Sequence, residues 1–336
     1  MQIIRYVLLM LGGITFFILG LKYMSENMER LAGQKMQKVL ASFTKNELSG
    51  VLTGAISTAV MQSSIATNVI LIGFVSSGML TFYSASAVIM GANIGTTITA
   101  QLVALSGSGF FDVTAFGSLV AFVGLLLSFL NKPKIQLIGS FMAGFGMLFF
   151  GLEVISDSVA FFKNFEFFRN IFLVKNHLLL FLNGFIITAI IQSSSAVTSV
   201  MIILGLNGLL TFESSMFIIL GANVGTCLCV LVASYNKPVE ARRAGWFNIL
   251  FNLTGALVLF IPLSIFSEQV SYAFSCFSGG IERQIANFHT LFNLFVTLIL
   301  LPILKPFTNL ICLFVKDDNQ QKPQKVSTKK VKIIKT

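Results

Sequence analysis

Two stretches of this chain, residues 54–96 and 184–226, repeat one another without a gap at a constant offset of 130 residues. Twenty of the 43 aligned positions are identical, and they include glycines and polar residues as well as aliphatic ones. Apolar composition alone produces matches of Ile, Leu or Ala, but not matched Gln, Asn, Ser and Gly. The chain therefore contains an internal duplication. The likeness extends weakly upstream at an offset of 131, where the paired residues are Gly13, Gly20, Leu21 and Ser25 with Gly144, Gly151, Leu152 and Ser156.

The composition indicates that the duplicated segments lie in a membrane. Of the 336 residues, 55% are hydrophobic and 11% charged, with a mean hydropathy of +0.86. Soluble domains carry about a quarter charged residues. We therefore predict an all-α polytopic membrane protein of about ten apolar segments, and not two soluble domains, a disordered chain or collagen. The apolar run Tyr6–Leu21 is followed by a Lys-rich segment and no small-residue cleavage site, so it is predicted to be a retained first span.

The distribution of basic residues predicts the topology. Placing the C-terminal tail inside puts 18 Lys and Arg on that side and five on the other. The first half then begins outside and the second inside, so the repeats are inverted, as in secondary transporters. The predicted divisions are a first transmembrane repeat at 1–130, a second with C-terminal helices at 131–315, and a basic cytoplasmic tail at 316–336. Half of the net charge of +10 lies in that tail, so no nucleic acid is expected as a partner, and anionic lipid is the expected contact.

Two further segments resemble interfacial anchors rather than spans. Residues 25–47 carry apolar side chains at helical spacing among charged ones, which suits a helix in the inner interface. The Phe-rich residues 161–172 suit the same role outside. The pair Cys227 and Cys229 stands in an apolar run without a nearby histidine, which indicates small hydrophobic residues rather than a metal or redox pair.

Two polar motifs, each present twice, carry the chemistry. An unpaired polar group in an apolar layer costs several kcal/mol, so such clusters require partners or a water-filled cavity. Each motif alone is explained by Ser and Thr bonding to the previous turn and by Gly and Ala allowing close packing. Duplication favours a binding site, because inverted halves would bring the clusters together near the midplane. The motif residues are Gln62, Ser63 and Ser64 with Gln192, Ser193, Ser194 and Ser195, and Asn93 and Thr96 with Asn223 and Thr226.

The stretch from Leu48 to Ala104 leaves two arrangements open. It is long enough for about three crossings, or for a re-entrant hairpin followed by a longer helix. Its glycines favour the hairpin. A helix broken within the membrane presents N–H groups to an anion and frees carbonyl, Gln and Ser oxygens for sodium.

With these motifs and the inverted duplication, residues 5–312 resemble the type II sodium-phosphate cotransporter family, including its bacterial members. The resemblance implies sodium-coupled symport of inorganic phosphate across the cell (inner) membrane, with sodium ions as coupling ions and no other cofactor. It implies a site for phosphate and sodium at Gln62, Ser63, Ser64, Gln192, Ser193, Ser194 and Ser195, completed by Asn93, Thr96, Asn223 and Thr226.

The sequence departs from the family pattern in three places. Ile65 stands where a third serine is usual, which removes one possible oxygen ligand. A short basic tail follows Val315, where many bacterial members carry a PhoU-like domain, so regulation through such a domain is not expected. His289 fits a His-x-x-Phe-Asn pattern, and a lone histidine in an apolar helix is expected to be packed and hydrogen-bonded rather than a ligand.

Two other functions stay open at this stage. The scarcity of intramembrane acids favours sodium over proton coupling. An uncoupled phosphate or anion exporter or channel would use the same polar hairpins, and a membrane adaptor would act through its basic tail. An enzyme is not expected, because the chain lacks an acid pair, a His-Glu-x-x-His motif and a Gly-x-Ser-x-Gly turn. The composition does not indicate the oligomeric state.

Overall fold

A computed structural model describes residues 2–42, 46–107, 112–165 and 176–317, and this part of the chain is helical without strands. The elements are α1 (Gln2–Ser42), α2 (Glu47–Met61), α3 (Ser64–Ser76), α4 (Phe82–Val103), η1 (Ala104–Gly107), α5 (Val113–Ser128), α6 (Pro133–Phe162), α8 (His177–Ile191), α9 (Ser194–Leu206), α10 (Phe212–Ser234), α11 (Val239–Ser278), α12 (Ile281–Leu300), η2 (Leu301–Ile303) and α13 (Leu304–Phe314).

Helix lengths confirm the all-α membrane class. Six helical stretches in the described residues are long and apolar enough to cross a bilayer, and five shorter apolar helices accompany them. In the first repeat, α2 has 15 residues and α3 has 13, whereas a crossing needs about 20. The second repeat has the same lengths in α8 and α9. Each repeat therefore pairs two short helices with one long helix, α4 or α10.

The same capping and turn residues mark the boundaries of these helices in both repeats. Thr81 and Thr211 are the N-caps of α4 and α10, and each hydroxyl accepts a hydrogen bond at 3.1 Å from the backbone N–H three residues later. The turn before each cap contains a glycine in the left-handed region, Gly78 at φ 74° and Gly208 at φ 73°. These shared residues explain why the boundaries match.

Within each repeat, glycines bring the first short helix against the long helix. A Cβ on Gly91 of α4 would lie 1.9 Å from the carbonyl oxygen of Val51 in α2, and a Cβ on Gly221 of α10 would lie 1.9 Å from that of Phe181 in α8. Such contacts leave no room for a side chain, so backbones touch directly. Two glycines of the Gly-Ala-Asn motif are thereby assigned to packing.

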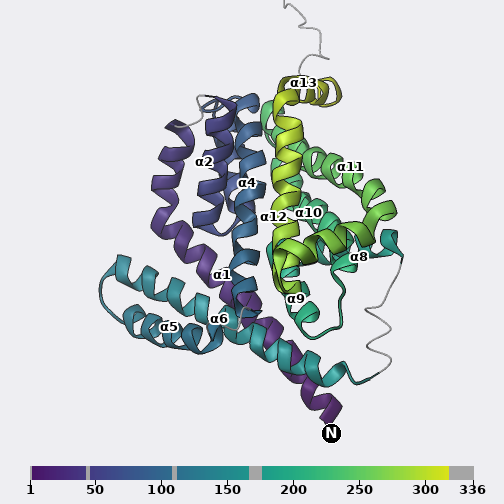
Figure 1. Ribbon diagram of the computed structural model, residues 1–336. Coiled ribbons are helices and arrows are strands. Elements are labelled where there is room, and N and C mark those ends of the chain that lie inside the picture. Colours follow the sequence, from purple (N-terminus) through teal and green to yellow (C-terminus); the bar gives the residue numbers. More distant parts are fainter. Residues whose placement is uncertain (1, 43–45, 108–111, 166–175, 318–336) are drawn as a thin grey trace, which may run out of the picture.

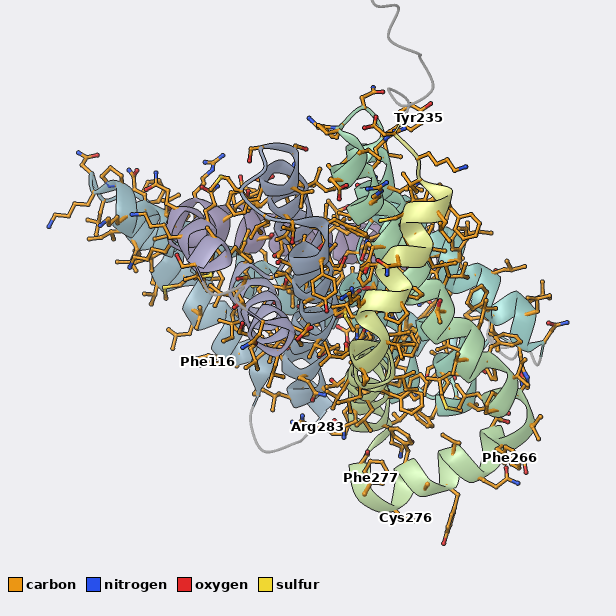
Figure 2. The ribbon with its side chains drawn as sticks, turned by 90° about the horizontal axis from the view of Figure 1, so that it is seen from above. Phe116, Tyr235, Phe266, Cys276, Phe277 and Arg283 are labelled. Carbon is orange, nitrogen blue, oxygen red and sulfur yellow. The ribbon has the colours of Figure 1, made fainter. Side chains whose placement is uncertain are left out.

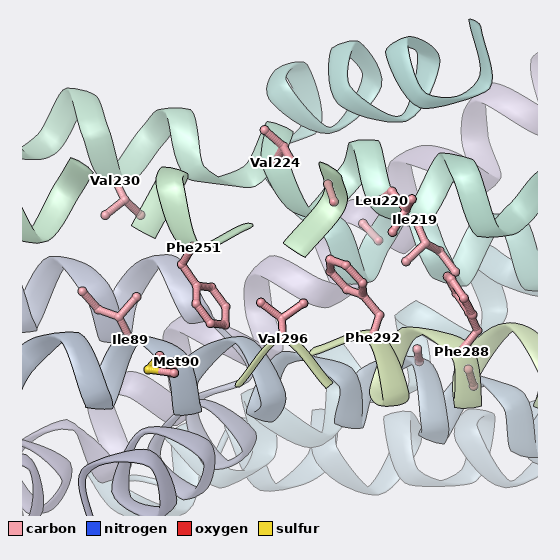
Figure 3. Packing of buried hydrophobic residues seen from close by; sticks show 14 of the residues in the cluster. Ile89, Met90, Ile219, Leu220, Val224, Val230, Phe251, Phe288, Phe292 and Val296 are labelled. Carbon is pink, nitrogen blue, oxygen red and sulfur yellow. The ribbon is translucent and has the colours of Figure 1, made fainter. Parts of the chain in front are cut away.

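The helices form two groups (Figure 1). α6 packs against both α1 and α5, again through glycines, since a Cβ on Gly20 would lie 2.4 Å from the backbone nitrogen of Leu148. α1 also reaches α2 of the second group, where the Ser25 hydroxyl donates to the carbonyl of Met61 at 3.2 Å. The remaining helices form the polar core and its apolar packing, where Phe251 of α11 and Phe292 of α12 meet side chains of α4 and α10 (Figure 3). α13 lies across the end of α12.

The predicted N-terminal features fall within one helix. α1 continues from the predicted first span through residue 42, so the expected interfacial helix is its C-terminal part. There Met28, Leu31 and Val39 are half-buried and Leu40 is buried, which confirms the apolar stripe. Most of the Phe-rich segment 161–172 and of the tail 316–336 lies outside the described residues.

α11 is interrupted rather than straight. Phe266 has non-helical angles, φ −116° and ψ 24°, one turn after Pro262, which cannot donate a backbone hydrogen bond. Phe266 at the interruption and Phe277 beyond it lie on the outer edge of the molecule (Figure 2) and expose their rings. Exposed aromatic rings on a membrane protein fit contact with lipid.

Gly91→Ala tests the backbone contact between α2 and α4. We expect a melting temperature lower by several degrees and a smaller folded fraction in detergent, because overpacking costs about 1–3 kcal/mol. Gly73→Ala in α3 is the matched control, since no neighbouring atom of the described chain lies within 4 Å of a Cβ there. Its melting temperature should stay or rise. Equal stability of the two variants would contradict the assignment.

Candidate substrate and cation site

Each Gln-Ser pair forms a break between two short helices. Gln62 (φ 54°) and Gln192 (φ 62°) are the non-glycine residues of the described chain in the left-handed region. Each ends its helix by donating its backbone N–H to Thr58 or Thr188. Left-handed backbone costs a non-glycine residue about 1–2 kcal/mol, and such strain concentrates at functional sites.

The serine after each glutamine begins the next helix. The Ser63 hydroxyl accepts from the backbone N–H of Ala66 at 3.1 Å, and the Ser193 hydroxyl accepts from that of Ala196 at 3.2 Å. The first turns of α3 and α9 therefore start at Ser64 and Ser194, within an apolar environment. A helix N-terminus carries a partial positive charge and N–H groups without intrahelical partners, so it suits an anion.

The chain bends sharply at the first break. The hydroxyl of Thr58 in α2 donates to that of Thr67 in α3 at 3.0 Å, although nine residues of continuous helix would separate them by about 13.5 Å. At the second break, Thr188 corresponds to Thr58 and Val197 to Thr67. The Thr188 hydroxyl is buried without a hydrogen-bond partner among the described residues.

The two glutamine side chains have different surroundings. The Gln62 carboxamide is held on both sides, since its Oε1 accepts from Thr99 at 2.7 Å and its Nε2 donates to the carbonyl of Ala59 at 2.5 Å. Gln192 is exposed, and the position that matches Thr99 is Cys229. The two motifs are thus equal in sequence but not in hydrogen bonding.

The fourth motif residue joins the two repeats. The Ser195 hydroxyl in α9 donates to the carbonyl of Thr96 in α4 at 3.0 Å. Ile65 occupies the matching position in the first repeat and cannot form such a bond. The predicted departure at Ile65 therefore removes a contact between the halves at one of the two equivalent positions.

The motif asparagines point to partners in the C-terminal half. Asn252 of α11 donates to Asn93 Oδ1 at 3.2 Å, and Asn293 of α12 donates to Asn223 Oδ1 at 3.5 Å. Asn252 also donates to the Cys227 sulfur at 3.1 Å. An amide network therefore connects α4, α10, α11 and α12.

This network leaves buried polar atoms without partners. The Oδ1 atoms of Asn248, Asn252 and Asn293 have no hydrogen-bond partner among the described residues, and neither ring nitrogen of His289 has one. Asn252, His289 and Asn293 are 0% exposed. Buried polar groups are normally satisfied by protein, water or an ion. These oxygens are therefore candidates for cation ligands.

His289, Asn293 and Thr297 follow one another at intervals of four residues and occupy one face of α12. The Thr297 hydroxyl is also buried without a partner in the described part of the chain. The expectation of a hydrogen-bonded His289 is wrong in this respect, because the side chain is packed but unpaired. The polar atoms form a buried stripe along α12.

Carboxylates lie away from the network. Glu153 is exposed, Asp112 caps α5 by accepting from the Ala115 N–H at 2.9 Å, and Glu213 accepts from Ser267 at 2.5 Å. Among the described residues, no Asp, Glu, Lys or Arg side chain takes part in the amide network. An uncharged set of amide, hydroxyl and carbonyl oxygens fits a hard monovalent cation better than a proton relay.

The predicted residues divide into three groups. Gln62, Gln192, Ser63 and Ser193 form the breaks, and Ser64 and Ser194 begin the helices after them. Ser195, Asn93 and Asn223 bond to distant elements. The hydroxyls of Thr96 and Thr226 instead donate to the carbonyl four residues earlier, each at 3.1 Å, as the packing interpretation predicted.

Sequence reasoning missed Asn248, Asn252 and Asn293. A signal was present, since Leu250-Phe251-Asn252 and Leu291-Phe292-Asn293 repeat three residues in α11 and α12. They fall outside the 130-residue repeat and belong to the same half. Cys227, predicted as a small hydrophobic residue, is buried as expected but also accepts a hydrogen bond from Asn252.

Known proteins resemble this chain over most of its length. The family model described as "Na+/Pi-cotransporter" matches residues 16–157 and 167–281. The chain is 29% identical to "Uncharacterized protein YqeW" of Bacillus subtilis, over 90% of this chain and 96% of that protein. It is 24% identical to "Putative inorganic phosphate export protein YjbB" of Escherichia coli, over 94% of this chain and 58% of that protein.

A shorter match of 36% identity covers 32% of this chain and 16% of the human "Sodium-dependent phosphate transport protein 2B". No solved structure matches the chain significantly. The chain thus spans nearly all of one relative and a little over half of another.

Ser195→Ala tests the bond between the repeats. We expect the melting temperature to fall by about 1–2 °C, because losing a buried hydrogen bond costs about 1 kcal/mol. Ser199→Ala is the control, since the Ser199 hydroxyl bonds only locally to the carbonyl of Ser195 within α9. A fall that is no larger for Ser195→Ala than for Ser199→Ala would show that the link to Thr96 adds nothing to stability.

Proposed function

The chain belongs to the Na+/Pi-cotransporter family, and on that premise we propose that it carries out sodium-coupled secondary active transport of inorganic phosphate across the cell membrane. The observation that carries the proposal is the pair of helix breaks beside an uncharged, incompletely satisfied amide network. The breaks provide helix N-termini for an anion, and the network provides oxygens for sodium.

Phosphate is assigned to the breaks. The N-terminal turns of α3 and α9, with the hydroxyls of Ser63, Ser64, Ser193 and Ser194 and the amides of Gln62 and Gln192, supply donors to its oxygens. Neutral donors and helix dipoles would hold a charged substrate that must also leave, whereas a buried Arg or Lys would bind it more tightly.

Sodium is assigned to the asparagines. Oδ1 atoms of Asn252 and Asn293, which have no partner among the described residues, lie beside Asn93 and Asn223 of the duplicated motifs. Sodium ions would act as coupling ions, with no other cofactor. Each positive charge that enters contributes about 2.3 kcal/mol per 100 mV, which can drive phosphate against its own unfavourable field.

The repeats are proposed to be inverted in the membrane, with α2–α3 and α8–α9 as re-entrant hairpins. Their short lengths and the bend between Thr58 and Thr67 support this. In this topology α13 and the basic tail lie on the cytoplasmic side, where positive charge is enriched.

An uncoupled phosphate exporter is the second candidate. The name of the Escherichia coli relative favours it, since that protein is called a phosphate export protein. The chain covers only 58% of that protein, and net direction follows the gradients in any such carrier.

Phosphate uptake into proteoliposomes separates these functions. We expect radiolabelled phosphate to enter with an inward sodium gradient, not with potassium in its place, and to resist excess sulfate. Flux that is indifferent to sodium would support the exporter, and no phosphate flux in either condition would contradict both.

Two variants of Gln192 distinguish the role of its side-chain amide from the role of its left-handed backbone conformation. Gln192→Gly removes the amide but relieves the left-handed strain, whereas Gln192→Ala keeps the strain. We expect both variants to lose most sodium-dependent uptake, with Gln192→Gly at least as stable as the parent. If Gln192→Gly keeps full uptake, the glutamine serves only the backbone. The same pair at Gln62 tests the first break.

Asn252→Leu tests the cation assignment. One ligand to a charged group contributes about 1.5–3 kcal/mol, so we expect the sodium concentration for half-maximal uptake to rise about tenfold or more. Asn27→Leu in α1 is the control, because Asn27 is buried but donates only locally to the carbonyl of Tyr23. Unchanged sodium dependence of a folded Asn252→Leu protein would remove Asn252 from the site.

A further inference from the structure

The Leu-Phe-Asn triplets of α11 and α12 belong to a longer repeat. Residues 242–253 match residues 283–294 at an offset of 41, and six of the 12 aligned positions are identical. Each copy begins with an arginine, Arg242 in α11 and Arg283 in α12. Each arginine therefore precedes the asparagine of its own helix, Asn252 or Asn293, by ten residues.

The two arginines have different surroundings. Arg242 donates to the carbonyl of Lys316 at 3.1 Å, so the end of α13 covers it. The Nη1 of Arg283 donates to Gln101 Oε1 at 3.3 Å, and its other guanidinium N–H groups bond to no residue that the structure describes. No carboxylate in the described part of the chain forms an ion pair with Arg283. Arg283 is thus a half-buried cation with unused hydrogen-bond donors.

Gln101 of α4 holds Arg283 in place. Its Nε2 donates to Asn287 Oδ1 at 3.1 Å and to Thr290 Oγ1 at 2.9 Å. Asn287 in turn donates to Ser278 Oγ, at the end of α11, at 3.1 Å. Because both N–H groups of the Gln101 amide are occupied, its Oε1 is fixed toward Arg283. We call these five side chains the outer polar cluster.

The outer polar cluster lies beyond the amide network along two helices that contact each other, α4 and α12. Arg283 precedes Asn293 by about 15 Å of helix, and Gln101 follows Asn93 by about 12 Å. In the proposed topology these are the outer ends of α4 and α12. Leu231 stands in the second repeat where the first has Gln101, so the glutamine has no counterpart at the inner end of α10.

We propose that Arg283 is the first residue to bind phosphate on the outer side, before phosphate reaches the helix breaks. This inference rests on the proposed function. A guanidinium donates paired N–H groups to phosphate oxygens, and its charge raises the local concentration of anions. The breaks supply only neutral donors, so Arg283 adds the attraction that they lack. Its distance from the amide network leaves the bound sodium away from this positive charge.

Arg283→Gln tests the proposal in phosphatidylcholine proteoliposomes that hold the full-length protein. With an inward sodium gradient, we expect the phosphate concentration for half-maximal uptake to rise about tenfold, because one charge-assisted contact is lost. The maximal rate and the sodium dependence should be kept, since the breaks and the amide network are unchanged. Arg283→Lys retains the charge and should stay within about threefold of the parent.

Arg5→Gln in α1 is the matched control. It removes the same charge on the same predicted side, at an exposed position outside the outer polar cluster, and should leave the half-maximal concentration unchanged. An equal rise in both variants would overturn the inference. So would an Arg283→Gln protein that loses only maximal rate, because that result indicates a structural role.

The outcomes also separate this inference from the function on which it rests. Sodium-driven uptake by the parent, with an unchanged half-maximal phosphate concentration in a folded Arg283→Gln protein, would overturn the inference alone. No phosphate uptake by the parent protein would overturn the proposed function and this inference with it.

Discussion

A helix that ends inside an apolar layer needs local hydrogen-bond partners for its terminal N–H and C=O groups. The rest of this fold depends on how each Gln-Ser pair provides them. The glutamine takes left-handed angles that close the first helix, and the serine hydroxyl caps the second. The backbone can therefore break without exposing many unpaired groups. The first turn of the new helix is left with N–H donors that only a ligand or water can use.

The second requirement is that the broken helices be held in place without bulky side chains. Direct backbone contact at Gly91 and Gly221 places α2 on α4 and α8 on α10. Two residues later, Asn93 and Asn223 turn toward α11 and α12. One helical turn thus provides close packing on one face and an amide for the site on the other. This explains why glycine and asparagine occur together in the motif.

The helical membrane class and the equality of the two cores could be predicted from the sequence, because apolar composition, threonine caps and turn glycines are local signals. The left-handed glutamines could not, since such angles usually indicate glycine or asparagine. For Asn252 and Asn293 the local signal was the repeated Leu-Phe-Asn triplet, which does not indicate their partners. Their partners lie 159 and 70 residues away, so only the fold brings them together. Whether the ring nitrogens of His289 find a hydrogen-bond partner likewise depends on how α12 packs.

The hydrogen bonds between the halves limit how a carrier with this core can move. Between the halves, Ser195 links α9 to α4 and Asn252 links α11 to α4, whereas Asn293 links α12 to α10 within the second half. Rocking of the first repeat against the second would break the first two bonds together. A movement that keeps these helices in contact retains both and leaves the amide network intact. The group formed by α1, α5 and α6 contributes none of these bonds. It is joined to the polar core by other ones, since Ser25 of α1 donates to the carbonyl of Met61 at 3.2 Å and Asn207 donates to Ser156 of α6 at 3.0 Å. A movement between that group and the core would therefore have to break these two bonds.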